Sequence, residues 1–202
     1  KSVLAMGAHP DDIEIGCFGT LMKLNTCAYI SVFIGSLGTP GDSTTGPNRA
    51  VETKAAFQYL EVTNLEIREV PGITIADFET LLQQMRALIV HIQPDLIICN
   101  GPKDTHQEHR LFWEICLAAT RRCATSILHY GTASNSIDFN PIVFVDISDH
   151  YETKKSALAE HKSQKDKDYM DEPHLGVFHS NTFSSLNGLR YSEPFELSRG
   201  FF

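Results

Sequence analysis

A histidine and two aspartates lie close together near the amino terminus. His9, Asp11 and Asp12 follow a short apolar run, residues 3–7, which predicts a buried strand. Imidazole and carboxylate groups together suit zinc and other first-row divalent metals. His9 and Asp12 are therefore candidate ligands of one ion, with Asp11 a free carboxylate beside it, as in metal-assisted hydrolases. Pro-Asp-Asp is also ordinary turn chemistry, which is the alternative interpretation of this loop.

A second loop with histidines follows another apolar run. Residues 96–99 predict a strand, and His106 and His109 come shortly after it. Because sites in open α/β sheets lie at the carboxyl ends of strands, the two loops are expected to meet. A catalytic zinc site has three protein ligands and one open position. His9, Asp12 and one of His106 or His109 would complete such a set.

Taken together, these motifs resemble those of the LmbE-like or PIG-L family. The first is His9-Pro-Asp-Asp-x-Glu-x-Gly, and the second is His106-Gln-Glu-His109, where His-Pro-Asp-His is commoner in the family. Further similar segments extend the resemblance over nearly the whole chain; these are Arg49-x-x-Glu52, 144–147, 155–164 and 191–195. The family consists of metal-dependent de-N-acetylases of N-acetylglucosamine-type sugars.

The resemblance implies a role for each residue of the two motifs. His9, Asp12 and His109 would be the metal ligands. Asp11 would be the general base, and His106 would assist the oxyanion or the leaving amine. A nearby acid such as Asp104 or Glu108 is expected to keep His106 protonated. The implied metal is Zn²⁺, with another divalent ion such as Fe²⁺ as an alternative. The implied enzyme is a hydrolase of linear amide C–N bonds, a zinc-dependent N-deacetylase that removes an N-acetyl group from an N-acetylglucosamine-type sugar or glycoconjugate with metal-activated water.

Arg49 is a candidate substrate-binding residue. It follows a glycine-rich loop, 35–47, near the start of a predicted helix that runs to about Leu60. A guanidinium there could hold a sugar hydroxyl or a phosphate through paired donors. The alternative is an exposed arginine that pairs with Glu52 one turn later. The family resemblance favours substrate binding.

The order of the predicted elements indicates an α/β fold. Apolar runs that alternate with amphipathic segments favour a parallel sheet with right-handed crossovers, so we expect a Rossmann-like three-layer αβα sandwich with a mostly parallel sheet. The expected strands are 3–7, 28–34, 65–70, 96–100, 127–130 and 142–147. The expected helices are 16–25, 49–60, 78–92, one with His109 in its first turn, and 149–162, the last with Asp149 and Glu152 as a capping box.

Composition limits the possible partners. The 202 residues suit a single domain, 1–202, with 163–202 a candidate lid or oligomer contact. The net charge of −8 disfavours nucleic acid, and no transmembrane stretch or signal peptide is visible. Five cysteines without a CxxC pair indicate reduced core thiols and a cytoplasmic protein. The family resemblance implies a small-molecule amino sugar or glycoconjugate as the partner, and a homo-oligomer stays open, as do the roles of His161, His174 and His179.

Two other function classes are compatible with the same residues. Two histidines and one carboxylate also form the facial triad of non-haem iron oxygenases. Those enzymes usually have β-barrel folds, whereas this chain alternates strands and helices. A non-catalytic carbohydrate-binding protein on the same fold is the third class. Loss of Asp11 or of a ligand would favour it, but all of these residues are present.

Overall fold

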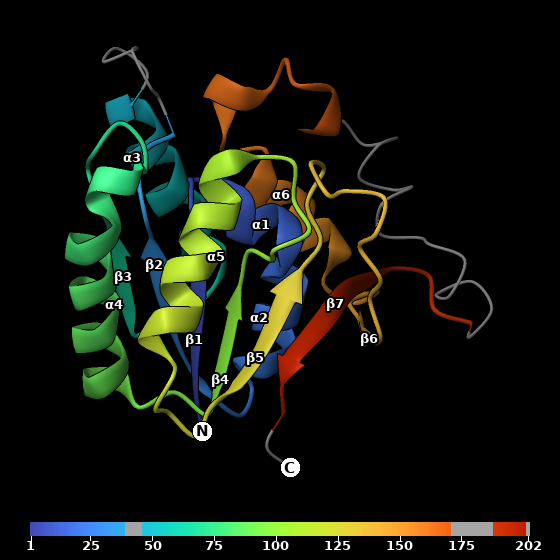
Figure 1. The fold of residues 1–202 in the computed structure, drawn as a ribbon. Helices are drawn as coiled ribbons and strands as arrows, with labels where there is room; N and C mark the ends of the chain where they lie inside the picture. Colours follow the sequence, from blue (N-terminus) through green and yellow to red (C-terminus); the bar gives the residue numbers. More distant parts are fainter. Residues whose placement is uncertain (39–45, 171–187, 201–202) are drawn as a thin grey trace.

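A seven-stranded sheet forms the middle layer of the protein (Figure 1). The computed structural model describes residues 1–38, 46–170 and 188–200. The strand order is β3-β2-β1-β4-β5-β7-β6, and β7 runs antiparallel to the other six strands. The strands are β1 Ser2–Gly7, β2 Tyr29–Ile34, β3 Asn64–Ile67, β4 Leu96–Cys99, β5 Ser126–Tyr130, β6 Val143–Asp146 and β7 Ser192–Arg199.

Helices cover both faces of this sheet, which confirms the predicted three-layer α/β fold. They are α1 Asp12–Gly16, α2 Phe18–Leu24, α3 Gly46–Ala56, α4 Phe78–Ile92, α5 Gln107–Ala119 and α6 Tyr151–Leu158. Leu4 and Met6 of β1 belong to the core cluster under α4 and α5, whereas Val3 and Ala5 belong to the cluster under the other helices. Strand β1 is thus buried on both faces, which explains its uninterrupted apolar run.

The amino-terminal helix differs from the prediction. One helix was expected over 16–25, but α1 begins at Asp12, inside the histidine-aspartate motif, and ends at Gly16. The backbone turns at Cys17, with φ −150°, before α2 begins. Gly16 is needed here because a Cβ at this position would lie 2.2 Å from the ring of Tyr130. The motif is therefore part of a short helix that packs closely against β5.

Two local predictions are wrong. The capping box of Asp149 and Glu152 does not form, because α6 begins after His150 and Glu152 is then one position too early for the box. Cys27 is exposed in a turn after α2, although all five cysteines are free thiols as expected.

Among the described residues, no helix is long and apolar enough to cross a membrane.

The carboxyl-terminal segment contributes to the sheet. Residues 192–199 of the candidate lid form β7, which lies between β5 and β6. Short 3₁₀ helices, η3 Lys162–Gln164 and η4 Asp168–Met170, precede it. His174 and His179 lie outside the described residues, as do positions 39–45 of the glycine-rich loop.

Candidate metal centre

The two predicted loops meet at the carboxyl edge of the parallel strands. Strands β1 and β4 are hydrogen-bonded neighbours, so the segments that follow them lie side by side. A cavity of about 370 Å³ opens at this edge. All six site residues expected from the sequence line it: His9, Asp11, Asp12, Arg49, His106 and His109.

The side chains of His9, Asp12 and His109 converge in this cavity. His9 Nδ1 lies 3.1 Å from His109 Nε2 and 3.9 Å from Asp12 Oδ2, and His109 Nε2 lies 3.3 Å from Asp12 Oδ1. Two ligands of a tetrahedral zinc ion are about 3.3 Å apart when the bonds are about 2.0–2.1 Å long. The spacing and the chemistry of His9, Asp12 and His109 therefore fit a divalent metal.

Each of the two histidines has a carboxylate on its other ring nitrogen. His9 Nε2 lies 3.1 Å from Glu108 Oε2, and His109 Nδ1 lies 2.8 Å from Asp104 Oδ2. Such carboxylates orient the imidazoles of metal sites. Glu108, which departs from the commoner family motif, thus supports His9. The sequence offered no signal for this pairing, because Glu108 is adjacent to His109 in the chain but contacts His9.

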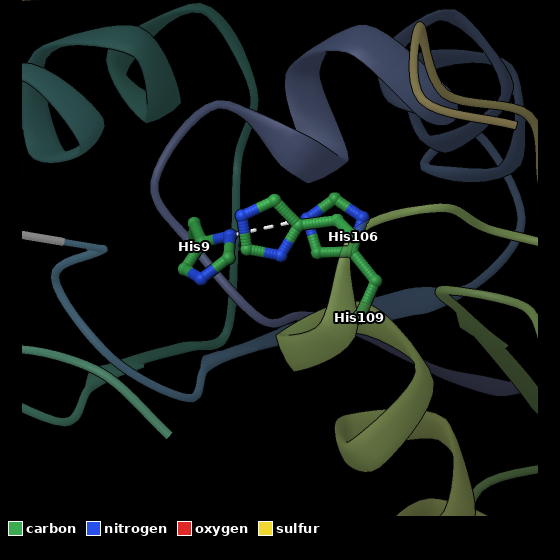
Figure 2. A group of neighbouring side chains, drawn as sticks. All are labelled: His9, His106 and His109. Atoms are coloured by element: carbon green, nitrogen blue, oxygen red, sulfur yellow. Dashed lines mark hydrogen bonds between the residues drawn. The ribbon is translucent and has the colours of Figure 1, made fainter. Parts of the chain in front are cut away.

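His106 lies at the exposed side of the cluster. It is the N-cap of α5, and its Nδ1 accepts a hydrogen bond from the backbone N–H of Glu108 at 3.3 Å. Its ring stacks on His109 with the centroids 4.5 Å apart (Figure 2). Nitrogens of His9, His106 and His109 all lie within 4.8 Å of one another, so the three imidazoles are a second candidate ligand set.

The charge state of His106 differs from our expectation. A nearby acid such as Asp104 or Glu108 was expected to keep this imidazole protonated, but these carboxylates pair with His109 and His9. Partial burial lowers the pKa of His106, and the charges of His109 and His9 lower it further. The pKa of His106 therefore moves in the opposite direction to the one expected, which favours the neutral imidazole.

Asp12 is held as an ionised carboxylate. Burial alone would raise its pKa, but the charge and hydrogen bond of His109, together with His9, bring the pKa below its usual range. The His9 backbone N–H and the Asn100 side-chain amide both donate to Asp12 Oδ2, at 3.0 and 3.2 Å. Asn100 also accepts from the Tyr130 hydroxyl at 3.0 Å. The position of Asn100 directly after β4 was the only sequence signal for its contact with Asp12.

Asp11 has a different environment from its neighbour. Its backbone is left-handed, with φ 94°, which is uncommon outside glycine, and its side chain makes no capping hydrogen bond to α1. Burial raises its pKa to about 6, although the positive charge of Arg49 opposes this. Among the described residues, Asp11 Oδ2 is buried and has no hydrogen-bond partner.

Arg49 contacts the loop of Asp11. Its Nη2 lies 3.3 Å from Asp11 Oδ1 and donates to the Pro10 carbonyl at 2.6 Å, while Nη1 donates to the Gly38 carbonyl at 2.9 Å. The alternative pairing with Glu52 does not occur, because Glu52 accepts from Ser163 instead. Arg49 thus lines the cavity and also braces the loop that carries Asp11.

Two buried ion pairs and their hydrogen bonds connect helices α1, α2 and α6 with β7. His161 Nε2 lies 2.8 Å from Glu14 Oε1, and Lys154 Nζ lies 2.5 Å from Glu193 Oε1. The Glu193 carboxylate also accepts the backbone N–H groups of Gly19 and Thr20. His161 and Glu193, which make these contacts, lie in the two segments that resemble the family, 155–164 and 191–195. Gln164, at the end of the similar segment 155–164, also lines the cavity, as do Lys167 and Tyr169, to which no sequence pattern had pointed.

Comparison with known proteins identifies similar sequences. The family described as PIG-L, GlcNAc-PI de-N-acetylase, matches residues 4–120. An uncharacterised deacetylase of Escherichia coli K12, YaiS, is 30% identical over 81% of this chain and 91% of its own length. The diacetylchitobiose deacetylase of Thermococcus kodakarensis is 26% identical over 100% of this chain and 85% of its own length.

The fold also occurs with other chemistry. The solved structure of 4-carboxy-2-hydroxymuconate hydratase GalB from Pseudomonas putida KT2440 superposes with a TM-score of 0.82 at 16% identity. The match covers 100% of this chain and 98% of the hydratase. Likeness at this identity concerns the fold alone, so the reaction has to be argued from the site.

Proposed function

The chain belongs to the PIG-L (LmbE-like) family of de-N-acetylases, and on this premise we propose that it removes an N-acetyl group from an N-acetylglucosamine-type sugar or glycoconjugate. The observation that carries the proposal is the convergence of His9, Asp12 and His109 at 3.1 and 3.3 Å in the cavity that Asp11 also lines, with Asp11 Oδ2 free of hydrogen-bond partners among the described residues. The similarity to a diacetylchitobiose deacetylase supports the substrate class.

We assign the metal to His9, Asp12 and His109. Asp12 is favoured over His106 because its oxygen lies 3.3 Å from His109 Nε2, whereas His106 already uses Nδ1 for the Glu108 backbone N–H. Zn²⁺ and Fe²⁺ both suit two imidazoles and one carboxylate. When bound, such an ion would polarise the acetamide carbonyl and lower the pKa of water from about 15.7 toward about 7.

Asp11 is the proposed general base. Its Oδ2 has no hydrogen-bond partner among the described residues and is free to accept a proton from the attacking water. A pKa of about 6 suits this task, because a base works best when its pKa lies near the operating pH. Arg49 lies beside the other oxygen and keeps the carboxylate ionised and in place. Protonated Asp11 can then deliver the proton to the leaving amine.

His106 is the proposed hydrogen-bond donor to the developing oxyanion. Because its Nδ1 accepts from the Glu108 backbone, the neutral ring carries its proton on Nε2. A neutral donor at the start of a helix can stabilise charge that develops only in the transition state. His106 would therefore lower the barrier without a large effect on substrate affinity.

Detection of the free amine tests this function. The purified protein, loaded with Zn²⁺ or Fe²⁺, is incubated with N-acetylglucosamine, its disaccharide, and lipid-linked and nucleotide-linked forms. We expect release of the amine from at least one of them, and loss of that release in Asp11→Asn. Absence of amine from all of these substrates with metal-loaded protein would contradict the proposal.

The alternatives give different results in the same experiment. An iron oxygenase would need dioxygen and a co-substrate, so its turnover would stop under anaerobic conditions, whereas deacetylation would continue. A non-catalytic carbohydrate-binding protein would retain the sugar without release of amine. The unpartnered Oδ2 of Asp11, which neither alternative needs, favours hydrolysis.

A further inference from the structure

The carboxylate of Asp104 is buried beneath the metal centre and accepts four hydrogen bonds. Oδ2 lies 2.8 Å from His109 Nδ1 and 2.7 Å from the Thr132 hydroxyl. Oδ1 accepts from the backbone N–H of His106 at 2.8 Å and from the Ser134 hydroxyl at 2.6 Å. Asp104 thus connects both histidines of the second motif to the loop that follows β5.

The partners of the Asp104 carboxylate determine which nitrogen of His109 carries a proton. The backbone N–H of His106 can only donate, so Oδ1 has to be an acceptor. The two hydroxyls can donate to either oxygen. An ionised carboxylate accepts on both oxygens, so it takes a proton-bearing nitrogen from His109 as its fourth partner. His109 therefore carries a proton on Nδ1.

We propose that Asp104 is a positioning residue that holds His109 in the tautomer with the proton on Nδ1. This tautomer leaves the Nε2 lone pair directed at the point where Asp12 and His9 converge. Thr132 and Ser134 hold the carboxylate in that orientation, and both also line the cavity. The inference rests on the proposed ligand role of His109 and extends it to a residue outside the ligand set.

An asparagine at this position creates a conflict that distinguishes positioning from simple packing. If its NH₂ group faced the backbone N–H of His106, two donors would oppose each other, and neither can change. The NH₂ group therefore turns toward His109, whose Nδ1 must then accept, so the proton moves to Nε2. The Nε2 lone pair of His109, which would bind the metal, is then occupied by the proton. An alanine leaves room for water, which can still accept from Nδ1.

Zinc affinity of the purified full chain is the decisive measurement. We expect Asp104→Asn to weaken Zn²⁺ binding about 10–100-fold, the usual effect of such partners. Asp104→Ala should weaken it less, and excess Zn²⁺ should restore turnover in that variant. Nitrogen-15 NMR of the zinc-loaded protein should show a protonated Nδ1 at His109. Thermal unfolding of each variant, measured without metal, separates loss of fold from loss of the tautomer.

A serine in the same loop provides the matched control. Ser136 donates to exposed Asp138 rather than to the metal centre, so Ser136→Ala should bind Zn²⁺ like the unaltered protein. Ser134→Ala should weaken binding, because it removes one anchor of Asp104. Wild-type affinity in Asp104→Asn, or a loss in Asp104→Ala as large as in Asp104→Asn, would overturn the proposal. If the variants differ in Zn²⁺ affinity as expected but the unaltered protein deacetylates none of the substrates, the proposed function is contradicted and this inference stands.

Discussion

Asp11 and Asp12 are adjacent and buried, yet their pKa values move in opposite directions. Burial raises the pKa of Asp11 to about 6, against the opposing charge of Arg49. Burial would also raise the pKa of Asp12, but the contacts with His109 and His9 outweigh it and lower that pKa. Separated pKa values of neighbouring acids are typical of sites that give the two groups different tasks. The difference supports Asp11 as a proton acceptor and Asp12 as a permanently charged ligand.

The first prediction concerns Asp11. Asp11→Asn should lower kcat about 10²–10⁴-fold, because an amide cannot accept the proton of water. Metal content, measured by elemental analysis, should not change, since Asp12 and the two histidines remain. Asp12→Asn is the control and should lose metal and turnover together. Near-normal hydrolysis by metal-loaded Asp11→Asn would rule out the role assigned to this residue.

The pH profile gives a second test of Asp11. The base acts only when it is deprotonated, so kcat should fall as the pH decreases through the pKa of this carboxyl. That pKa is about 6 in the metal-free protein, and a bound cation lowers it because it favours the charged form. The acidic limb should therefore lie at or below pH 6 and disappear from the residual activity of Asp11→Asn.

The third prediction compares His106 with His109. His109→Ala should lose metal and activity together, because the remaining ligands are too few for a catalytic site. His106→Ala should keep its metal and KM but lower kcat, about 10²–10³-fold if an oxyanion donor is lost. Metal analysis and steady-state kinetics of both variants check this. Metal loss in His106→Ala with retention in His109→Ala would favour the three-histidine set instead.

Arg49 is the subject of the fourth prediction. Its guanidinium faces Asp11, so removal of the charge in Arg49→Ala should raise the pKa of Asp11 and move the acidic limb of the profile to higher pH. KM should also rise if the residue binds substrate, as expected from its place in the cavity. Metal content should not change. A raised KM with an unchanged acidic limb would leave substrate binding as the only role of Arg49.

The fifth prediction concerns stability and uses two neighbouring lysines. Lys154 is buried and pairs with Glu193, whereas Lys155 pairs with an exposed Glu152. Lys154→Ala leaves the Glu193 carboxylate buried without its partner and should lower the free energy of unfolding by about 3–5 kcal/mol. Lys155→Ala should cost less than about 1 kcal/mol. Urea unfolding of both variants measures the difference, and equal losses would show that the buried pair has no special role.

The sequence determined the fold class and six of the residues that line the cavity. The apolar run of β1 and the apolar stripe of α4 are local patterns, and local patterns are sufficient to predict strands and helices. The two histidine loops follow parallel strands, so their meeting at one edge also followed from the order of the elements. For this reason all six predicted site residues lie in one cavity.

The pairing of charges within that site was decided only by the tertiary structure. Glu108 contacts His9, and Asp104 contacts Thr132 and Ser134, across separations that no local pattern encodes. These contacts leave no carboxylate paired with the His106 ring, and burial lowers the pKa of His106 instead of raising it as expected. A side chain's pKa depends on burial and on every charge packed around it. Chain order specifies which residues reach the carboxyl edge, whereas three-dimensional packing specifies which atoms meet there and hence which groups are charged.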